Sequence, residues 1–263
     1  MKKDRWIIFL LIAALGCKKE SEPVIYYTDN IVVAHRGAWA DGHCPQNSLA
    51  SLQKAIEMKC IGSEFDVWLT KDDSLIVEHD PTYAGKNVET TTYAKLAATK
   101  LSNGETLPTL RQYLLTASGQ SQTKLFLEIK SLNYDNNILL AITDSVLNLV
   151  AEMNMQDYMV YSSFHFTMLQ RIHQRLPDAK THFLGGTYTP DEVKSAGITG
   201  IDYDIDSFYQ HLNWLTNAKT DSLSLGAWTV DSDQQFTWLI NNKFDFIITD
   251  APNELFRVLD KMR

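Results

Sequence analysis

Charged and titratable side chains stand at the ends of four apolar runs in the first half of this sequence. Residues two apart in a β-strand point to the same side, so a Glu-x-Asp or Glu-x-Lys pair presents both of its charges together. The side chains are His35 and Arg36 after the run 31–34, Glu64 and Asp66 within 61–69, His79 after 75–78, and Glu128 and Lys130 at the end of 124–129.

The chemistry of these side chains favours a site for a phosphate ester and a hard metal ion. Three carboxylates that face one another repel unless a cation lies among them, and carboxylate oxygens suit Mg²⁺ or Ca²⁺. Arg36 and Lys130 add fixed positive charge of the kind that binds phosphate. The two histidines supply an acid and a base near neutral pH. Each element alone is a weak signal, and the four strand ends in order are a strong one.

The elements that would position these residues alternate between strand and helix. Apolar residues recur at helical spacing in 48–58, 136–152 and 233–241. Such alternation over about 250 residues predicts an α/β fold with an eight-stranded parallel (β/α)8 TIM barrel, in which the C-terminal strand ends meet at one mouth. The strand-like runs are 31–35, 61–69, 75–79, 124–129, 158–163, 181–184, 198–203, 224–230 and 244–249.

One of these runs is an extra strand. Only Thr70–Ser74 separates 61–69 from 75–79, whereas a parallel crossover needs about a dozen residues. The two runs should therefore pair antiparallel through a tight turn. A turn centred on Asp72 and Asp73 would place His79 across from Asp66.

Composition limits the remaining possibilities. The chain has 263 residues, 44% of them hydrophobic, which is enough for one sizeable core. Lys and Arg number 24 against 32 Asp and Glu, a formal net charge of −8, so nucleic acid is not expected as a partner. No internal repeat or second linker is evident, and we predict one domain over residues 31–263.

The first thirty residues are typical of export and anchoring. Lys2, Lys3 and Arg5 precede the apolar run 6–15, which is too short to span a bilayer as a mature helix. The residues 14–17, Ala-Leu-Gly-Cys, resemble a bacterial lipobox. We therefore expect a lipoprotein signal peptide over 1–16, lipidation of Cys17 and a tether over 17–30. An ordinary secretory signal with an incidental cysteine is the alternative.

A lipoprotein signal predicts that the domain lies in the bacterial cell envelope, anchored to a membrane by lipid and either periplasmic or on the outer surface. Cys44 and Cys60 are the thiols left after Cys17, and that compartment permits disulfides. The two either pair or remain free thiols. Cys44 and the adjacent His43 could suggest a soft-metal site, but we expect them to belong to a loop.

The ordered set of motifs resembles the glycerophosphodiester phosphodiesterase family, in its lipoprotein-type form, over about residues 31–260. That family is a distorted (β/α)8 barrel of phosphodiesterases that use a divalent cation. The matching stretches are His35-Arg36-Gly37, Pro45-Gln46-Asn47-Ser48, Glu64-Phe65-Asp66-Val67, Thr70-Lys71-Asp72, His79-Asp80-Pro81, Leu107-Pro108-Thr109-Leu110, Leu127-Glu128-Ile129-Lys130, Ser163-Phe164, Ala227-Trp228-Thr229-Val230 and Thr249-Asp250-Ala251-Pro252.

The resemblance implies a role for each site residue and a cofactor, one Ca²⁺ or Mg²⁺ ion. The implied reaction is hydrolysis of a small glycerophosphodiester to glycerol 3-phosphate and an alcohol. The implied roles are His35 and His79 as the acid–base pair, Glu64, Asp66 and Glu128 as metal ligands, Arg36 and Lys130 on the phosphate, and Trp228 and Phe164 along the glycerol side of the pocket.

The sequence departs from the family at Gln46, where Glu is usual. If that Glu touches the metal only through water, the change would alter ion preference; if it contributes directly to the metal's charge balance, cation affinity would fall. Asn47 is retained and would orient the loop after the first strand. The alternatives are another phosphodiesterase of this barrel type, phospholipase C-like or sphingomyelinase D-like, or a catalytically weakened phosphate-binding lipoprotein. A structural envelope protein is the least favoured.

Overall fold

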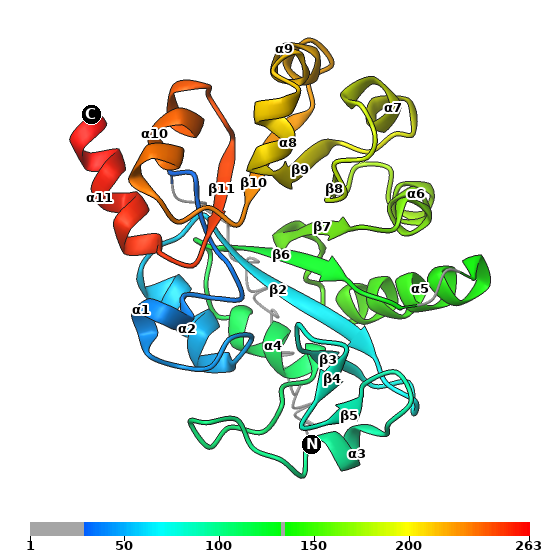
Figure 1. The fold of residues 1–263 in the computed structure, drawn as a ribbon. Helices are drawn as coiled ribbons and strands as arrows, with labels where there is room; N and C mark the ends of the chain where they lie inside the picture. The colour runs from blue at the N-terminus through cyan, green and yellow to red at the C-terminus, as the bar shows by residue number, and fades with distance from the viewer. Residues whose placement is uncertain (1–28, 133–134) are drawn as a thin grey trace, which may run out of the picture.

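Eight parallel strands form a closed ring, with helices around its outside (Figure 1). The computed structural model describes residues 29–132 and 135–263. The predicted signal peptide, Cys17 and nearly all of the predicted tether lie outside these residues. The ring strands are β1 (Val32–Ala34), β2 (Gly62–Leu69), β6 (Lys124–Ile129), β7 (Met159–Ser163), β8 (Lys180–Phe183), β9 (Gly200–Asp204), β10 (Ser224–Trp228) and β11 (Phe246–Thr249).

The ring closes because β1 pairs in parallel with both β2 and β11. Ala34 lies opposite Ser63 on one side and opposite Thr249 on the other. The alternation of the sequence therefore produces the predicted (β/α)8 barrel. The described helices are α1 (Trp39–Gly42), α2 (Leu49–Glu57), α3 (Tyr93–Leu96), α4 (Leu110–Ala117), α5 (Asn136–Glu152), α6 (Phe166–Arg175), α7 (Pro190–Ser195), α8 (Ile205–Gln210), α9 (Asn213–Thr220), α10 (Asp233–Asn241) and α11 (Pro252–Met262), with a 3-10 turn at Gln156–Tyr158.

Local sequence signals set where the helices begin. Ser48 caps α2 by accepting a hydrogen bond from the backbone N–H of Ser51. Thr109 and Gln112 form a reciprocal capping box at the start of α4. The three predicted helices are confirmed, and 136–152 matches the bounds of α5.

The extra strand is confirmed, with a correction to its register. β3 (Leu75–Val77) pairs antiparallel with β2 through the turn 70–74. Val67 lies opposite Val77, and the backbone N–H of Glu78 donates to the carbonyl of Asp66 at 3.1 Å. Glu78, and not His79, therefore lies across from Asp66. The predicted register was wrong by one residue. The strands pair about a centre at Asp72 rather than between Asp72 and Asp73, and the turn has its single left-handed residue at Asp73, with φ of 57°.

A small antiparallel pair, β4 (Thr82–Tyr83) and β5 (Lys86–Asn87), follows β3 and was not predicted. It belongs to a lobe that also contains α3 and has a core of its own. That core is formed by Trp68, Ile76, Val88, Leu96 and Leu107. The apolar residues of the lobe are therefore used to bury one another.

The two cysteines of the domain are free thiols, so the disulfide alternative is wrong. Cys60 is fully buried, and burial raises the pKa of its thiol to about 12. Cys44 is half-buried in the turn after α1.

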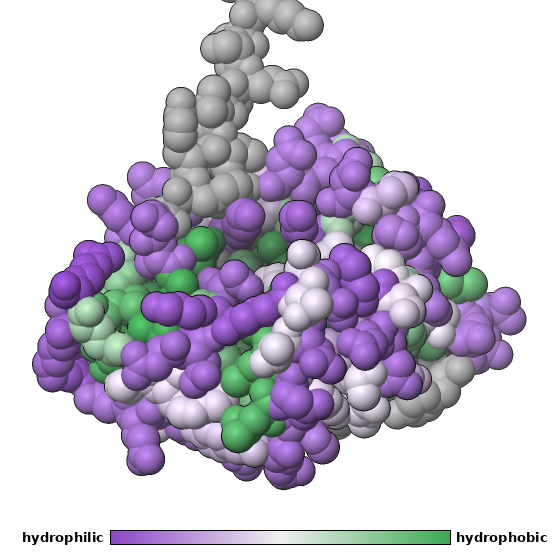
Figure 2. All heavy atoms as spheres, turned by 90° about the horizontal axis from the view of Figure 1, so that it is seen from above, coloured by the Kyte–Doolittle hydropathy of each residue, from purple (hydrophilic) through white to green (hydrophobic). Residues whose placement is uncertain are grey.

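Within the described residues, no helix has the length and apolar character needed to cross a membrane. Hydrophilic residues cover most of the face shown in Figure 2, with hydrophobic residues in patches between them.

Two glycines make room for large rings inside the barrel. The interior is filled by Val33, Phe126, Val160, Phe246 and Ile248. A Cβ atom on Gly62 would lie 2.4 Å from the Phe126 ring, and one on Gly226 would lie 2.1 Å from the Phe246 ring. The interior is therefore closely packed at these two points.

Replacing Gly226 by Ala should destabilise the barrel. The added methyl group would overlap the Phe246 ring, and forcing extra volume into a packed core costs about 1–3 kcal/mol. Gly119→Ala is the control, because nothing lies within 4 Å of that Cβ position, and surface changes of this kind stay within about 0.5 kcal/mol. Urea unfolding of both variants measures the difference. Equal stability of the two would contradict this account of the interior.

Candidate active site

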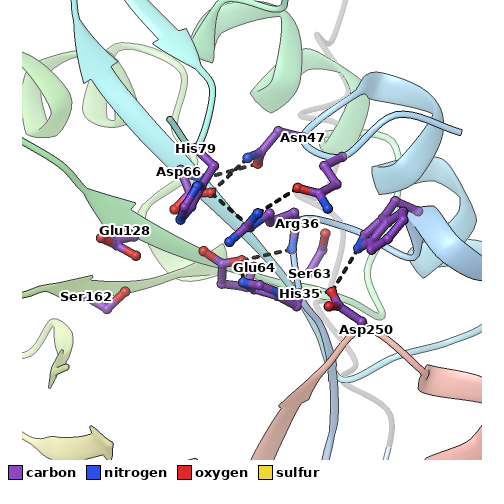
Figure 3. Close-up of polar contacts among 12 residues, drawn as sticks. His35, Arg36, Asn47, Ser63, Glu64, Asp66, His79, Glu128, Ser162 and Asp250 are labelled. Atoms are coloured by element: carbon purple, nitrogen blue, oxygen red, sulfur yellow. Dashed lines mark hydrogen bonds and ion pairs between the residues drawn. The ribbon is translucent and has the colours of Figure 1, made fainter. Parts of the chain in front are cut away.

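The predicted site residues meet at the C-terminal ends of the strands, around a cavity of about 110 Å³. They come from β2, β6, β10 and the segments that follow β1, β3 and β7, as Figure 3 shows in part. Of the nine residues predicted for the pocket, the cavity wall includes His35, Arg36, Glu64, His79, Glu128, Lys130, Phe164 and Trp228. Asp66 lies behind this wall with 1% of its surface exposed.

Glu64, Asp66 and Glu128 form a buried group of three carboxylates. One oxygen from each lies within 4.8 Å of the others, and no other such group occurs in residues 29–132 and 135–263. All three side chains lie on the inner face of the barrel, since Asp66 pairs with Glu128 across β2 and β6. An all-oxygen donor set of this size fits a hard divalent cation.

Burial and mutual repulsion change the acidity of this group. Burial, together with the charges of Asp66 and Glu128, raises the pKa of Glu64 well above its ordinary value. Burial raises the pKa of Glu128 to about 7, against the opposing effect of Lys130. Burial alone would also raise the pKa of Asp66, but Lys130, His79, Asn47 and Arg36 together lower it.

Lys130 lies between two of these carboxylates. Its Nζ atom is 3.1 Å from Asp66 Oδ1 and 2.9 Å from Glu128 Oε1. Although burial opposes it, the charges of Asp66 and Glu128 raise the pKa of Lys130, so the amine stays protonated. Lys130 therefore supplies a fixed positive charge at the wall of the cavity.

Arg36 contributes both its backbone and its side chain. Its N–H donates to Glu64 Oε2 at 2.8 Å, and its guanidinium donates to Gln46 Oε1 at 2.6 Å. The Nε atom of Arg36 is buried, lies 3.9 Å from Asp66 Oδ2 and has no hydrogen-bond partner among the described residues. Arg36 also lines the cavity, so it places a fixed positive charge at the cavity wall.

The loop after β1 has the strained backbone that these contacts need. Arg36 and Asn47 have positive φ values of 53° and 56°, and Gly37 has 76°. A Cβ atom on Gly37 would lie 2.4 Å from Ser51 Oγ. Asn47 donates from its backbone N–H to the carbonyl of Arg36 at 2.9 Å, which orients this loop as predicted. Its side-chain amide also donates to Asp66 Oδ2 at 2.8 Å.

Each histidine is held by an aspartate through its Nδ1 atom. His35 Nδ1 lies 2.9 Å from Asp250 Oδ1, which also accepts a hydrogen bond from the indole N–H of Trp39 at 2.9 Å. His35 Nε2 lies 4.0 Å from Glu64 Oε2. His79 Nδ1 lies 2.8 Å from Asp80 Oδ1. Both rings therefore have Nδ1 paired with a carboxylate, which leaves Nε2 for a reacting group.

The opposite wall of the cavity is aromatic and contains one unexpected carboxylate. Phe164 packs edge-on against Trp228, with ring centres 5.7 Å apart. The indole N–H of Trp228 donates to the backbone carbonyl of Asp202 at 2.8 Å. The Asp202 side chain lines the cavity with 1% exposure, and burial, with the charge of Glu128, raises its pKa well above the ordinary value.

The residues that orient the two histidines and the aromatic wall were not predicted from the sequence. Asp250, Asp80 and Asp202 were given no role, although Asp250 directly follows the apolar run 244–249 and Asp202 lies within the run 198–203. Trp39 carried no usable signal, because it lies in an irregular stretch and reaches Asp250 only across 211 residues of chain. His43 is exposed and lies with Cys44 in the turn after α1, so both belong to a loop, as expected.

Known proteins with similar sequences and structures include several phosphodiesterases. A glycerophosphodiester phosphodiesterase from Caldanaerobacter subterraneus is 28% identical over 249 residues, covering 88% of this chain and 98% of the relative. A solved glycerophosphodiester phosphodiesterase from Parabacteroides distasonis has a TM-score of 0.86 and 34% identity, covering 90% and 99%. An Oleispira antarctica phosphodiesterase, solved with the product sn-glycerol-3-phosphate, has the same fold, with a TM-score of 0.76 and 20% identity, covering 88% and 97%.

The family comparison covers the whole site. Residues 35–254 match the model of the glycerophosphoryl diester phosphodiesterase family. This span runs from His35 through Asp250 and so includes both histidines, the three carboxylates and both cationic side chains. The chain therefore belongs to the glycerophosphoryl diester phosphodiesterase family.

Proposed function

We propose that this protein is a metal-dependent hydrolase that cleaves glycerophosphodiesters to glycerol 3-phosphate and an alcohol. One observation carries the proposal. Two histidines held by aspartates, three buried carboxylates and the positively charged side chains of Arg36 and Lys130 lie together at one cavity of about 110 Å³. The product found with the Oleispira antarctica relative supports the same substrate class.

The side chains divide the reaction between them. The guanidinium of Arg36 and the amine of Lys130, which both line the cavity, would bind phosphate oxygens and stabilise the charge that develops on them. A water molecule attacks phosphorus while the bond to the leaving alcohol breaks, which gives glycerol 3-phosphate directly. If the glycerol C2 hydroxyl attacks instead, the product is a cyclic phosphate, which a water molecule then opens to glycerol 3-phosphate. We assign His35 as the base that takes the attacking proton and His79 as the acid that protonates the leaving oxygen.

Glu64, Asp66 and Glu128 would hold one divalent cation, Ca²⁺ or Mg²⁺. When bound, the cation would neutralise part of the phosphate charge. It would also relieve the repulsion among the three carboxylates, which contributes to the raised pKa values of Glu64 and Glu128. Gln46 contacts Arg36 rather than any carboxylate of the group, so we propose that its replacement of the family Glu tunes cation preference without removing a ligand.

The alternatives have less support. A phospholipase C-like or sphingomyelinase D-like enzyme needs an apolar surface for acyl chains near the cavity. The segment 81–107 offers little of it, because Val88, Leu96 and Leu107 are buried in a separate core. A weakened phosphate-binding protein would not need two histidines each oriented by an aspartate. A panel of soluble and lipid phosphodiesters, assayed by release of glycerol 3-phosphate, separates these possibilities.

The histidine assignment is tested by His35→Ala and His79→Ala. Acid or base catalysis contributes about 10²–10⁴-fold, so each variant should lose about a thousandfold in kcat while keeping its fold by circular dichroism. His43→Asn is the control, because His43 is exposed and Asn tolerates its positive φ of 49°. Near-normal turnover by purified His79→Ala would exclude that residue as the acid.

Cation binding should depend on pH in a defined direction. Burial raises the pKa of Glu128 from 4.5 to about 7 and that of Glu64 also upwards, so a cation must displace protons at low pH. Affinity should fall below about pH 7 by up to tenfold per pH unit for each displaced proton, and level off at high pH. Calorimetry with Mg²⁺ or Ca²⁺ at several pH values measures this.

The same pKa shifts predict how the stability of the metal-free protein depends on pH. Glu128 has a higher pKa in the folded protein than in the unfolded chain. Its contribution to the free energy of unfolding is therefore fully present below pH 4.5 and is lost as the pH rises through about 7. The rise in Tm on adding cation should therefore be larger above pH 7 than below it.

Removing the cation should remove the activity. A chelator should abolish hydrolysis, with recovery on adding Mg²⁺ or Ca²⁺. Undiminished activity after exhaustive chelation would contradict the role of the three carboxylates.

We also propose that the mature chain is anchored to a bacterial envelope membrane through lipidated Cys17, as the lipobox-like residues suggest. Cys17→Ser should move the protein from the detergent phase to the aqueous phase in Triton X-114 partition, with its activity unchanged. Cys44→Ser is the matched control, because Cys44 is another free thiol. Aqueous partition of the unmodified protein would favour an ordinary secretory signal instead.

A further inference from the structure

The end of the barrel opposite the candidate active site contains a second and larger cavity. It has a volume of about 550 Å³ and lies where the ring strands begin. Lys124 and Lys180 are the first residues of β6 and β8. Part of its wall is apolar, formed by Phe126, Val160 and Phe246. We call it the basal cavity.

The basal cavity concentrates positive charge in an acidic protein. Lys124, Lys180 and Lys194 line it, in a chain with a formal net charge of −8. An adjoining cavity, which shares Ser222, Ser224 and Asp245 with it, adds Lys219 and Lys243. Asp245 is the one acidic residue among the described residues that line the two cavities, and its carboxylate accepts a hydrogen bond from the backbone N–H of Leu225 at 2.7 Å.

The two lysines at the strand starts face the same space. Residues alternate between the two faces of a strand, so Lys124 shares the inner face with Phe126, and Lys180 shares it with His182. Burial and the charge of Lys180 lower the pKa of Lys124. Lys180 and Lys194 form no ion pair with any residue in 29–132 or 135–263. An anion bound beside Lys180 and Lys194 would therefore balance positive charge that no described residue balances through an ion pair.

A buried hydrogen-bonding group lies at the same place. His182 lines the basal cavity with 4% of its surface exposed, and its Nδ1 atom has no hydrogen-bond partner among the described residues. Burial, with the charges of Lys124 and Lys180, lowers the pKa of its imidazole to about 3, so the ring is neutral. A neutral imidazole can donate its N–H to an anion without adding a buried charge.

We propose that the basal cavity is a binding site for a phosphorylated ligand, separate from the active site. Lys124, Lys180 and Lys194 would surround the phosphate, and His182 would donate a hydrogen bond to it. Lysine amines bind phosphate as point charges, and a dianion balances several of them where a single carboxylate would not. Since the cavity exceeds the size of a phosphate group, the rest of the ligand would lie against Phe126 and Phe246.

The test uses the mature chain with Cys17→Ser and follows the histidine rings by NMR. Inorganic phosphate and phenyl phosphate are titrated separately, with His182→Gln identifying the basal resonance. We expect saturable shifts of the His182 ring with both probes, and tighter binding of phenyl phosphate because its ring can lie on the apolar wall. Shifts of His35 and His79 report binding at the active site, so the two sites are read independently.

Lys180→Gln with Lys194→Gln should weaken binding at His182 by at least about tenfold, since each lost charge removes a contact to the phosphate. Lys71→Gln with Lys261→Gln is the matched control, because it removes two charges from exposed positions elsewhere. Hydrolysis of glycerophosphodiesters should be unchanged in both double variants. A His182 ring that does not respond to either probe, or that responds equally in both double variants, would overturn the proposal for soluble ligands.

A lipid headgroup could supply the same phosphate chemistry. Sedimentation of the same proteins with vesicles of phosphatidylglycerol, compared with phosphatidylcholine, tests this source. Binding to the anionic vesicles that depends on Lys180 and Lys194 would identify a headgroup as the ligand. Absence of both vesicle binding and a His182 response would exclude the basal cavity as a phosphate site.

Discussion

Three carboxylates held within 4.8 Å of one another inside a protein repel strongly, and the rest of the site exists around that repulsion. Lys130 lies against two of them, the backbone N–H of Arg36 holds the third, and the amide of Asn47 fixes the remaining oxygen of Asp66. Burial keeps water from screening these charges. The group is therefore set up to accept a cation, and the raised pKa values of Glu64 and Glu128 reflect the same burial and repulsion.

The barrel makes this arrangement possible by its alternation of faces. In β2 the inner positions are Glu64 and Asp66, while Phe65 and Val67 on the outer face pack into the core under the helices. The lower part of the interior is filled by Phe126 and Phe246, for which Gly62 and Gly226 leave space. The apolar side chains fill the barrel interior below the C-terminal strand ends, so the carboxylates lie at that end, beside the cavity.

The strands and the principal site residues could be predicted because each depends on local pattern. All nine strand-like runs overlap a strand, and the places of Glu64, Asp66, Glu128 and Lys130 within or just after strands follow from the pattern of apolar residues. Contacts that join distant segments could not be predicted in this way. The pairing of Asp250 with His35 spans 215 residues, the register of β3 depends on the conformation of Asp73, and the two free thiols reflect spatial placement that spacing does not specify. The short pair β4–β5 has too few residues for any periodicity.

The contact between His35 and Asp250 joins the first strand of the ring to the loop after the last. β1 also needs β11 beside it before the ring is closed, and Asn253 in α11 bonds to Asp41 at the other end of the chain. The three buried carboxylates come from β2 and β6, early in the chain, whereas the carboxylate that holds His35 follows the last strand. The orientation of His35 therefore depends on the meeting of the two edges of the sheet, and a change that loosens the β1–β11 pairing would disturb this histidine before it disturbs the carboxylates.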